Sequence, residues 1–215
     1  MKIRKSIFLF LLLIFVLPSL ACKLPFWKDQ PETVDPGILP GYAVYNNGIV
    51  EIVLPDTYQE RDIRADIPII TKALEFFGSS GLGVSVESIV DELLKNTVFW
   101  AVDGDIEAEE TIKLLILKNK LLANVPLGMI GSSIETLFRI PDDQFDTETM
   151  KLGENDVVRL TLYHKESSEA IYALKDESLL WLIIFISTPD QMPLQLSSFE
   201  DSVATFKVIS IPLED

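Results

Sequence analysis

Residues 179–186 read Leu-Leu-Trp-Leu-Ile-Ile-Phe-Ile, a series of eight apolar residues without a polar interruption. Glu177-Ser178 precede this run and Thr188-Pro189 follow it, so residues typical of turns bound it on both sides. The run is too short to cross a bilayer, which takes roughly 20 residues. A strand that is apolar at every position must be covered on both faces. The run therefore predicts the central strand of a buried sheet.

Further strands are expected on both sides of a few turn signals. Asn47-Gly48 is typical of a hairpin turn, and Asp103-Gly104 lies between two β-rich runs, with an acidic loop behind it. Glu166-Ser167-Ser168 separates a strand with alternating polarity from a shorter apolar one. The strands predicted in this way are Ile49 to Leu54, Thr97 to Val102, Thr111 to Leu117, Val157 to His164 and Ala170 to Leu174.

Helices are expected where apolar residues recur every three or four positions behind a residue that can cap the first turn. The final one has Ser197 and Glu200 as a capping box, with Phe199, Val203 and Phe206 on one face. The earlier ones begin at Asp66, with Pro68 in the first turn, at Ser85 and at Pro126. Hairpins with interposed helices predict an α+β class. A central strand covered on both faces makes it a three-layer sandwich, mainly antiparallel, with helices on both faces.

The N-terminus has the pattern of an export signal. Lys2, Arg4 and Lys5 precede an unbroken apolar run of eleven residues, Ile7 to Leu17, which is shorter than a membrane-spanning helix. Ala21 and Cys22 follow closely, and Cys22 is the only cysteine of the chain.

This arrangement resembles the lipobox of bacterial lipoproteins. The small residue Ala21 stands before the expected cut, and Ser19 stands where the family commonly has Leu. The resemblance implies cleavage between Ala21 and Cys22, a diacylglyceryl group on the Cys22 thiol, and anchoring at the extracytoplasmic face of a bacterial cell membrane. Two alternatives stay open: ordinary cleavage near Ala21 that leaves a free thiol, and an uncleaved N-terminal anchor.

The rest of the chain divides into a tether and one domain. We expect a signal peptide at 1–21, a lipid-anchored Pro-rich tether at 22–42, the folded domain at 43–210 and a short tail at 211–215. Four of the twelve prolines, Pro25, Pro31, Pro36 and Pro40, lie in the tether and favour an extended linker. Twenty extended residues reach roughly 65 Å, so the domain can stand clear of the bilayer.

Residues 44–209 resemble the PsbP-like sandwich domains, a family that includes extrinsic photosystem proteins and DcrB-type bacterial lipoproteins. The strand Val50 to Leu54 followed by Pro55-Asp56 is similar to the family's first strand and turn. The closing order of hairpin, apolar strand, Thr188-Pro189-Asp190 and final helix is also similar. Thr57-Tyr58 stands where Gly-Trp is common, and Thr205 where Ser is common. The resemblance implies a non-enzymatic module that binds or helps to assemble partners, without catalytic residues or a cofactor.

Composition excludes several classes of protein. The 18 Lys+Arg and 33 Asp+Glu give a net charge of −15, which argues against nucleic-acid binding. One cysteine and one histidine rule out a disulfide framework and His- or Cys-rich metal centres. Because an acidic surface is repelled by anionic headgroups, membrane attachment is assigned to the lipid. The charge favours solubility alone, with attraction of a cationic partner as the alternative.

The search for catalytic and metal-binding residues yields only weak candidates. His164 would have to serve any hydrolytic triad, and Gly131-Ser132-Ser133-Ile134-Glu135 lacks the second glycine of a nucleophile elbow. Residues 78–83 contain three glycines without a following lysine, which favours a loop over a phosphate cradle. Two acidic runs are interpreted as solvated loops, so a metal is not expected, and a weak Ca²⁺ site stays open as the alternative. Their members are Asp103, Asp105, Glu107, Glu109 and Glu110, then Asp142, Asp143, Asp146 and Glu148.

Three functional hypotheses follow. The first is a lipid-anchored module, not an enzyme, that binds or assembles a protein partner of unknown identity beside the membrane. The second is a carrier of a small apolar ligand, with a pocket between sheet and helices. The third is a hydrolase that uses His164 beside a serine and an acid. Trp100 and Trp181 are expected in the core under all three.

Overall fold

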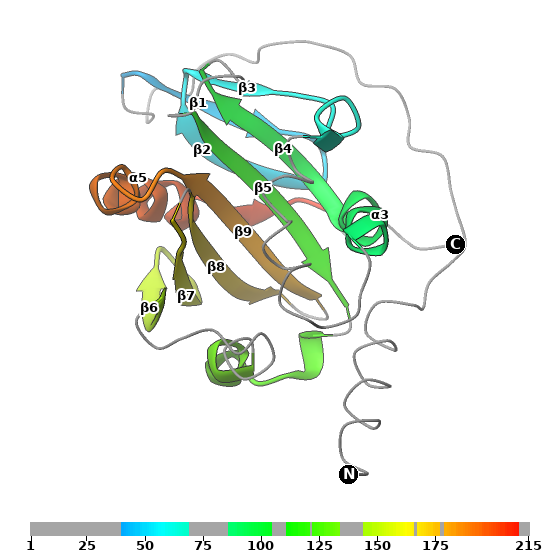
Figure 1. Ribbon diagram of the computed structural model, residues 1–215, viewed down its shortest axis with the longest axis vertical. Helices are drawn as coiled ribbons and strands as arrows, with labels where there is room; N and C mark the ends of the chain where they lie inside the picture. The colour runs from blue at the N-terminus through cyan, green and yellow to red at the C-terminus, as the bar shows by residue number, and fades with distance from the viewer. Residues whose placement is uncertain are drawn as a thin grey trace.

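A computed structural model describes residues 40–68, 86–104, 111–120, 122–133, 144–165, 167–176 and 179–210. Figure 1 shows a large sheet with a smaller sheet behind it and few helices around them. The described elements, in chain order, are β1 (Tyr42–Asn46), β2 (Val50–Pro55), β3 (Tyr58–Glu60), α3 (Val86–Asn96), β4 (Thr97–Asp103), β5 (Ile112–Asn119), η1 (Leu122–Asn124), η2 (Leu127–Met129), β6 (Phe145–Leu152), β7 (Asn155–Tyr163), β8 (Ser168–Asp176), β9 (Leu179–Ser187), α5 (Met192–Ala204) and β10 (Lys207–Val208).

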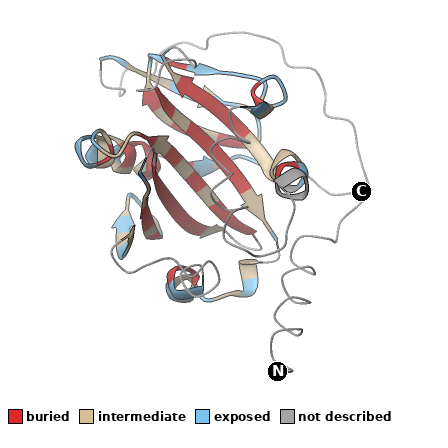
Figure 2. Ribbon diagram, in the orientation of Figure 1, coloured by how far each residue is buried: buried red, intermediate tan, exposed pale blue. Residues whose placement is uncertain are grey.

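The large sheet has seven strands in the order β3-β4-β5-β9-β8-β7-β6, and every pairing in it is antiparallel. β9 occupies the middle position, between β5 and β8, which confirms the prediction made from its apolar run. Figure 2 shows buried residues concentrated in these inner strands. Because β9 has three strands on each side, its backbone groups are all paired within the sheet and its side chains form the core.

One face of the large sheet is covered by α5 together with the small sheet, whose strand order is β1-β2-β10. Alternate residues of β9, among them Trp181, Ile183 and Phe185, point to this face and are fully buried. Phe199 of α5 stacks on Phe185 at a ring-centroid distance of 4.1 Å and an interplanar angle of 8°. The small sheet adds Ile52 and its neighbours on β2 to the same core.

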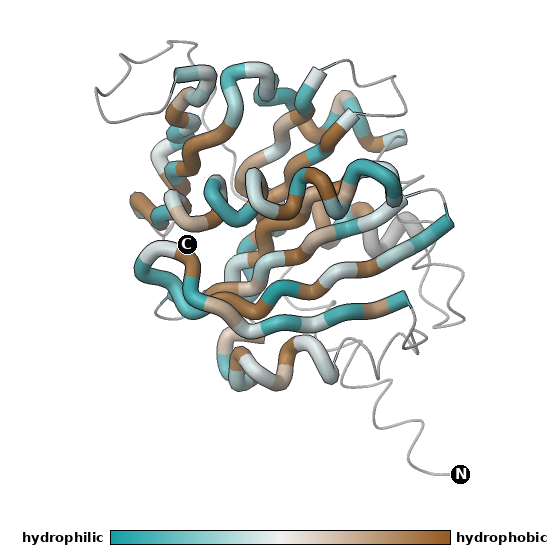
Figure 3. Tube along the Cα trace, turned by 90° about the vertical axis from the view of Figure 1, so that its left-hand side faces the viewer, coloured by the Kyte–Doolittle hydropathy of each residue, from teal (hydrophilic) through white to brown (hydrophobic). Residues whose placement is uncertain are grey.

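The opposite face is covered by α3 and by the η1–η2 segment. Leu93 of α3 packs on a cluster around Trp100, and Ile130, just after η2, packs on a cluster around Leu160. Leu182 and Ile184 of β9 contact both clusters and join them. α3 and α5 therefore lie against opposite faces of the large sheet, and the α5 layer also contains a second sheet that the sequence did not indicate. Figure 3 shows hydrophobic segments inside the molecule and hydrophilic ones at turns and strand ends.

Several boundaries differ from the predictions. The final helix begins at Met192, so Ser197 lies inside it and the predicted capping box at Ser197 is wrong. Pro193 in the first turn fits a helix start, because proline's missing N–H is not needed there. Phe199 and Val203 are buried on this helix, whereas Phe206 lies just beyond its end.

The predictions missed strand β6. Among the described strands it pairs only with β7, at the edge of the sheet, and five of its eight residues are exposed, so the apolar alternation that marks a strand is absent. Asp146 and Glu148 therefore lie in a strand and not in the expected acidic loop, while Asp142 and Asp143 lie outside the described residues. The short strands β1, β3 and β10 were missed for a related reason, because they are brief and partly exposed.

The remaining helix predictions are confirmed where the structure describes them. α3 follows Ser85 as expected, and helical backbone begins at Ile67 and again at Leu127, just after Pro126. Ser85 itself and the later parts of the two other helices lie outside the described residues. Within the described ranges, the helices are too short or too polar to cross a bilayer.

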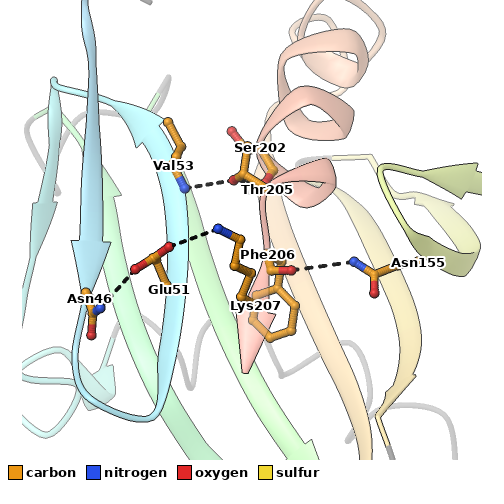
Figure 4. Close-up of polar contacts among 8 residues, drawn as sticks. All are labelled: Asn46, Glu51, Val53, Asn155, Ser202, Thr205, Phe206 and Lys207. Atoms are coloured by element: carbon orange, nitrogen blue, oxygen red, sulfur yellow. Dashed lines mark hydrogen bonds and ion pairs between the residues drawn. The ribbon is translucent and has the colours of Figure 1, made fainter. Parts of the chain in front are cut away.

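Polar contacts fasten the small sheet to the end of α5 (Figure 4). Thr205 Oγ1 donates to the Ser202 carbonyl at 2.7 Å and accepts from the Val53 backbone N–H at 2.9 Å. β10 pairs with β2 only at Val50 and Glu51. Thr205 therefore accepts the hydrogen bond of the Val53 N–H, which lies beyond the reach of β10. Lys207 pairs with Glu51 at 3.4 Å, which in turn accepts from Asn46 at 3.0 Å.

Candidate functional site

The single histidine lies in a buried polar cluster at the turn between β7 and β8. His164 Nε2 is 2.9 Å from Glu169 Oε2, and the two side chains are only 9% and 5% exposed. Ser167 Oγ is 3.0 Å from the other carboxylate oxygen of Glu169. The His164 backbone N–H donates to the Ser167 carbonyl at 2.9 Å and closes the turn.

This geometry differs from that of a hydrolytic triad. In a triad the imidazole lies between the serine and the acid, so that it can take the serine proton. Here the carboxylate of Glu169 lies between Ser167 and His164. The structure thus brings His164 beside a serine and an acid, but both contact the Glu169 carboxylate, which is not the order of a triad. The contact between His164 and Glu169 joins the two sides of the β7–β8 turn.

A second charged cluster joins α5 to the edge of the large sheet. Arg159 on β7 forms ion pairs with Glu148 of β6, at 2.6 Å, and with Glu200 of α5. The Arg159 side chain is only 12% exposed, so the two carboxylates compensate a largely buried charge. Sequence reasoning assigned Arg159 to the polar face of an alternating strand. That face is covered by α5 and contains the buried Thr161.

A third cluster holds the segment after β3 against the sheet. Asp66 is buried and accepts from Arg61 Nε at 2.7 Å, from Arg61 Nη2 at 2.9 Å and from Trp100 Nε1 at 2.8 Å. The hydrogen bonds from Arg61 lower the pKa of Asp66, and the Trp100 bond adds to them, whereas burial opposes the shift. The sequence marked Asp66 only as a candidate helix cap. Its link to Trp100, 34 residues away, had no local signal.

Two open strand edges meet at one side of the molecule. Among the described residues, β1 pairs only with β2, and β3 pairs only with β4. The hydroxyl of Tyr45 on β1 donates to the Tyr58 carbonyl on β3 at 2.5 Å, which places the two edges side by side (Figure 1). β1 is also where the chain from the predicted tether enters the domain.

Three carboxylates lie near enough to this junction for their charges to act on its tyrosines. Burial raises the pKa of Tyr45, and the negative charges of Asp56, Asp103 and Glu60 raise it further. Burial and Asp103 also raise the pKa of Tyr58, which pairs with Asp103 in the sheet register. Asp56 and Glu60 are exposed and Asp103 is half-buried. We call the three residues Asp56, Glu60 and Asp103 the acidic edge. Its field favours a cationic partner over an anionic one.

The other residues singled out from sequence are placed only in part. Ala21, Cys22, the glycine-rich residues 78–83 and the acidic residues 105–110 lie outside the described ranges. Within those ranges, no group of three or more His, Cys, Asp or Glu side chains has a metal-binding arrangement. Trp100 and Trp181 are both buried, as predicted. The aromatic stacking of Phe185 and Phe199 fills the layer between β9 and α5 at that point, and the pocket of the ligand-carrier hypothesis stays a prediction.

No family model and no curated protein matches the sequence of this chain. Comparison of backbones finds similar folds. Cyanobacterial PsbP (CyanoP) from Synechocystis sp. PCC 6803 aligns over 82% of this chain and 98% of its own, with 13% identity and a TM-score of 0.48. LpqN, described as involved in cell envelope biogenesis of Mycobacterium tuberculosis, aligns over 74% of this chain and 82% of its own, with 8% identity and a TM-score of 0.44.

A protein of Bacteroides thetaiotaomicron VPI-5482 aligns over 79% of this chain, with 10% identity and a TM-score of 0.38. The alignment spans 48% of that protein, so this chain corresponds to about half of it. These likenesses concern the backbone. The side-chain clusters described above are observed in this chain and are not inferred from those proteins.

Proposed function

We propose that this protein is a bacterial lipoprotein, held at the extracytoplasmic face of a cell membrane by a lipid on Cys22, whose PsbP-like domain binds or assembles a protein partner without catalysing a reaction. Anchoring rests on the position of Cys22 directly behind a short apolar run. Two acyl chains on one thiol give stable attachment, because each buried methylene contributes about 0.8 kcal/mol.

The order of elements supports the domain assignment. The PsbP-like resemblance implies an opening strand that ends in Leu-Pro, and β2 ends at Leu54-Pro55. It also implies a closing hairpin, an apolar strand and a final helix, and β7, β8, β9 and α5 follow one another in that order.

The observation that carries the binding role is the acidic edge. Three carboxylates lie near enough to Tyr45 to raise its pKa, beside strands β1 and β3, each of which pairs with a single strand among the described residues. Carboxylates at such an edge attract a partner surface rich in Lys and Arg and discourage pairing with other strands. The sole histidine is engaged with Glu169 in the turn of a hairpin, which supports a structural role for it.

The anchor is tested by Cys22→Ala in the native host. We expect the unchanged protein in the membrane pellet and the variant in the soluble fraction, since the variant lacks the acylated thiol. Lys23→Ala serves as the control and should stay in the pellet. A Cys22→Ala variant that remains in the membrane would favour the uncleaved anchor, and a soluble unchanged protein would favour plain secretion.

The binding surface is tested by crosslinking in intact cells followed by capture of the tagged full chain. The variant Asp56→Asn/Glu60→Gln/Asp103→Asn removes the acidic edge, and we expect it to lose captured protein several-fold. A matched control, Glu154→Gln/Asp156→Asn/Asp201→Asn, changes three exposed acids elsewhere and alters the net charge equally. Equal capture by both variants would remove the acidic edge from the proposal while leaving the lipid anchor intact.

A further inference from the structure

Asn47-Gly48 is the only Asn–Gly pair in the chain, and it forms the turn between β1 and β2. Asparagine is a thermolabile residue, and a following glycine, which has no side chain to obstruct attack, makes it most reactive. The Gly48 peptide nitrogen loses its proton and bonds to Asn47 Cγ. The bond from Cγ to the side-chain nitrogen then breaks, and ammonia leaves. Water opens the resulting succinimide ring at either carbonyl, giving aspartate or isoaspartate.

The folded turn holds both reacting groups in hydrogen bonds. The attacking nitrogen of Gly48 donates to Asn46 Oδ1 at 2.9 Å. Asn47 Oδ1 accepts from the backbone N–H groups of Ile49, at 2.9 Å, and Val50, at 2.8 Å. Deprotonation of the Gly48 nitrogen and rotation of the Asn47 amide therefore both require these bonds to break.

The side-chain amide of Asn47 also links the small sheet to the large sheet. Asn47 Nδ2 donates to the Val98 carbonyl on β4, 51 residues away, at 2.6 Å. A carboxylate in its place has no hydrogen to donate, and its oxygen would face the Val98 carbonyl oxygen, which is also an acceptor. Conversion of Asn47 would therefore break this bond between the turn and β4 at the same time as it changes the residue.

We propose that Asn47-Gly48 is a gated deamidation site, which is closed while the turn is docked on β4 and reacts when the turn opens. The gate is the set of bonds around Asn47 together with the Asn46 side chain that holds the Gly48 nitrogen. Because the product cannot remake the Val98 bond, each conversion permanently removes this link between the turn and β4. This inference is independent of the proposed partner and of the lipid anchor.

The test is peptide mapping of isoaspartate at position 47 during incubation of the full chain in detergent at mildly alkaline pH. The reference is an isolated peptide of residues 44–51, which lacks the fold. We expect conversion in the folded protein to be at least about tenfold slower than in the peptide, which corresponds to about 1.4 kcal/mol of opening free energy. Equal rates in protein and peptide would overturn the proposal.

The gate itself is tested by Asn46→Ala, which frees the Gly48 nitrogen at an exposed position. We expect conversion at Asn47 to speed up several-fold in this variant. Asn124→Ala, at another exposed asparagine, is the matched control and should keep the original rate. Identical rates in the two variants would show that Asn46 plays no part in the gate.

The consequence of conversion is tested with Asn47→Asp against Asn124→Asp, which adds the same charge at an exposed asparagine. We expect Asn47→Asp to lower the thermal midpoint markedly more than the control, because the Asn47 side chain bonds to β4. If Asn47→Asp fails to fold, the expectation is met in its strongest form, and the rate comparison above still decides the gate. Equal midpoints for both variants would contradict this link to β4.

Discussion

At the scale of single residues, the lack of a side chain at Gly153 lets a hairpin turn contact the end of α5. It lies in the turn between β6 and β7 with a φ of +58°, a conformation that glycine adopts without strain. A Cβ added there would lie 2.4 Å from the Ala204 carbonyl oxygen at the end of α5. The hairpin turn and the helix end therefore touch only because residue 153 has no side chain.

We predict that Gly153→Ala lowers the free energy of unfolding by about 2 to 4 kcal/mol, from backbone strain and overpacking together. The control is Gly104→Ala, where φ is +90° but no atom of the described residues lies within 4 Å of the new Cβ. That variant should lose only the strain, about 1 to 2 kcal/mol. Chemical denaturation of both measures the difference, and equal losses would show that the Ala204 contact relaxes without cost.

At the scale of elements, α5 has one docked face and one free face. Met192, Phe199, Ser202 and Val203 are buried against the sheets, whereas Leu194 in the first turn is 80% exposed. The helix is weakly amphipathic in sequence, which is why its predicted cap, Ser197, lies six residues after the observed cap, Gln191. Its position is decided by the stacking of Phe199 on Phe185 and by the ion pair between Arg159 and Glu200.

We predict that Phe199→Ala lowers the free energy of unfolding by about 3 to 5 kcal/mol, since it removes a stacked ring from a filled layer. Leu194→Ala, on the same helix, should change it by no more than about 0.5 kcal/mol. Denaturant midpoints of the two variants test this. A small loss for Phe199→Ala would mean that α5 contributes little to the core.

At the scale of the whole molecule, the acidic edge illustrates how charge becomes organised. The net charge of −15 is visible in composition, but it says nothing about where acids gather. Asp56, Glu60 and Asp103 are spread over 48 positions of the chain and converge only because β3 pairs with β4. The Tyr45 hydroxyl then brings the small sheet to the same point.

The sequence alone determined the central strand, the antiparallel hairpins and the α+β class. Apolar runs and turn residues act locally, so their signal survives without knowledge of the fold. Leu179 to Ile186 is the clearest case, because eight successive apolar residues admit few other structures. The same local logic underlies the expectation for Cys22.

Only the tertiary structure decided the second sheet, the buried charge clusters and the acidic edge. Strands such as β1 and β10 are too short to carry a pattern, and they exist because β2 is there to pair with them. The partners of Arg159, His164 and Asp66 are likewise set by strand register and packing. Hydrogen bonds and ion pairs act over a few ångströms in space, and one-dimensional spacing does not record which distant residues the fold brings within that range.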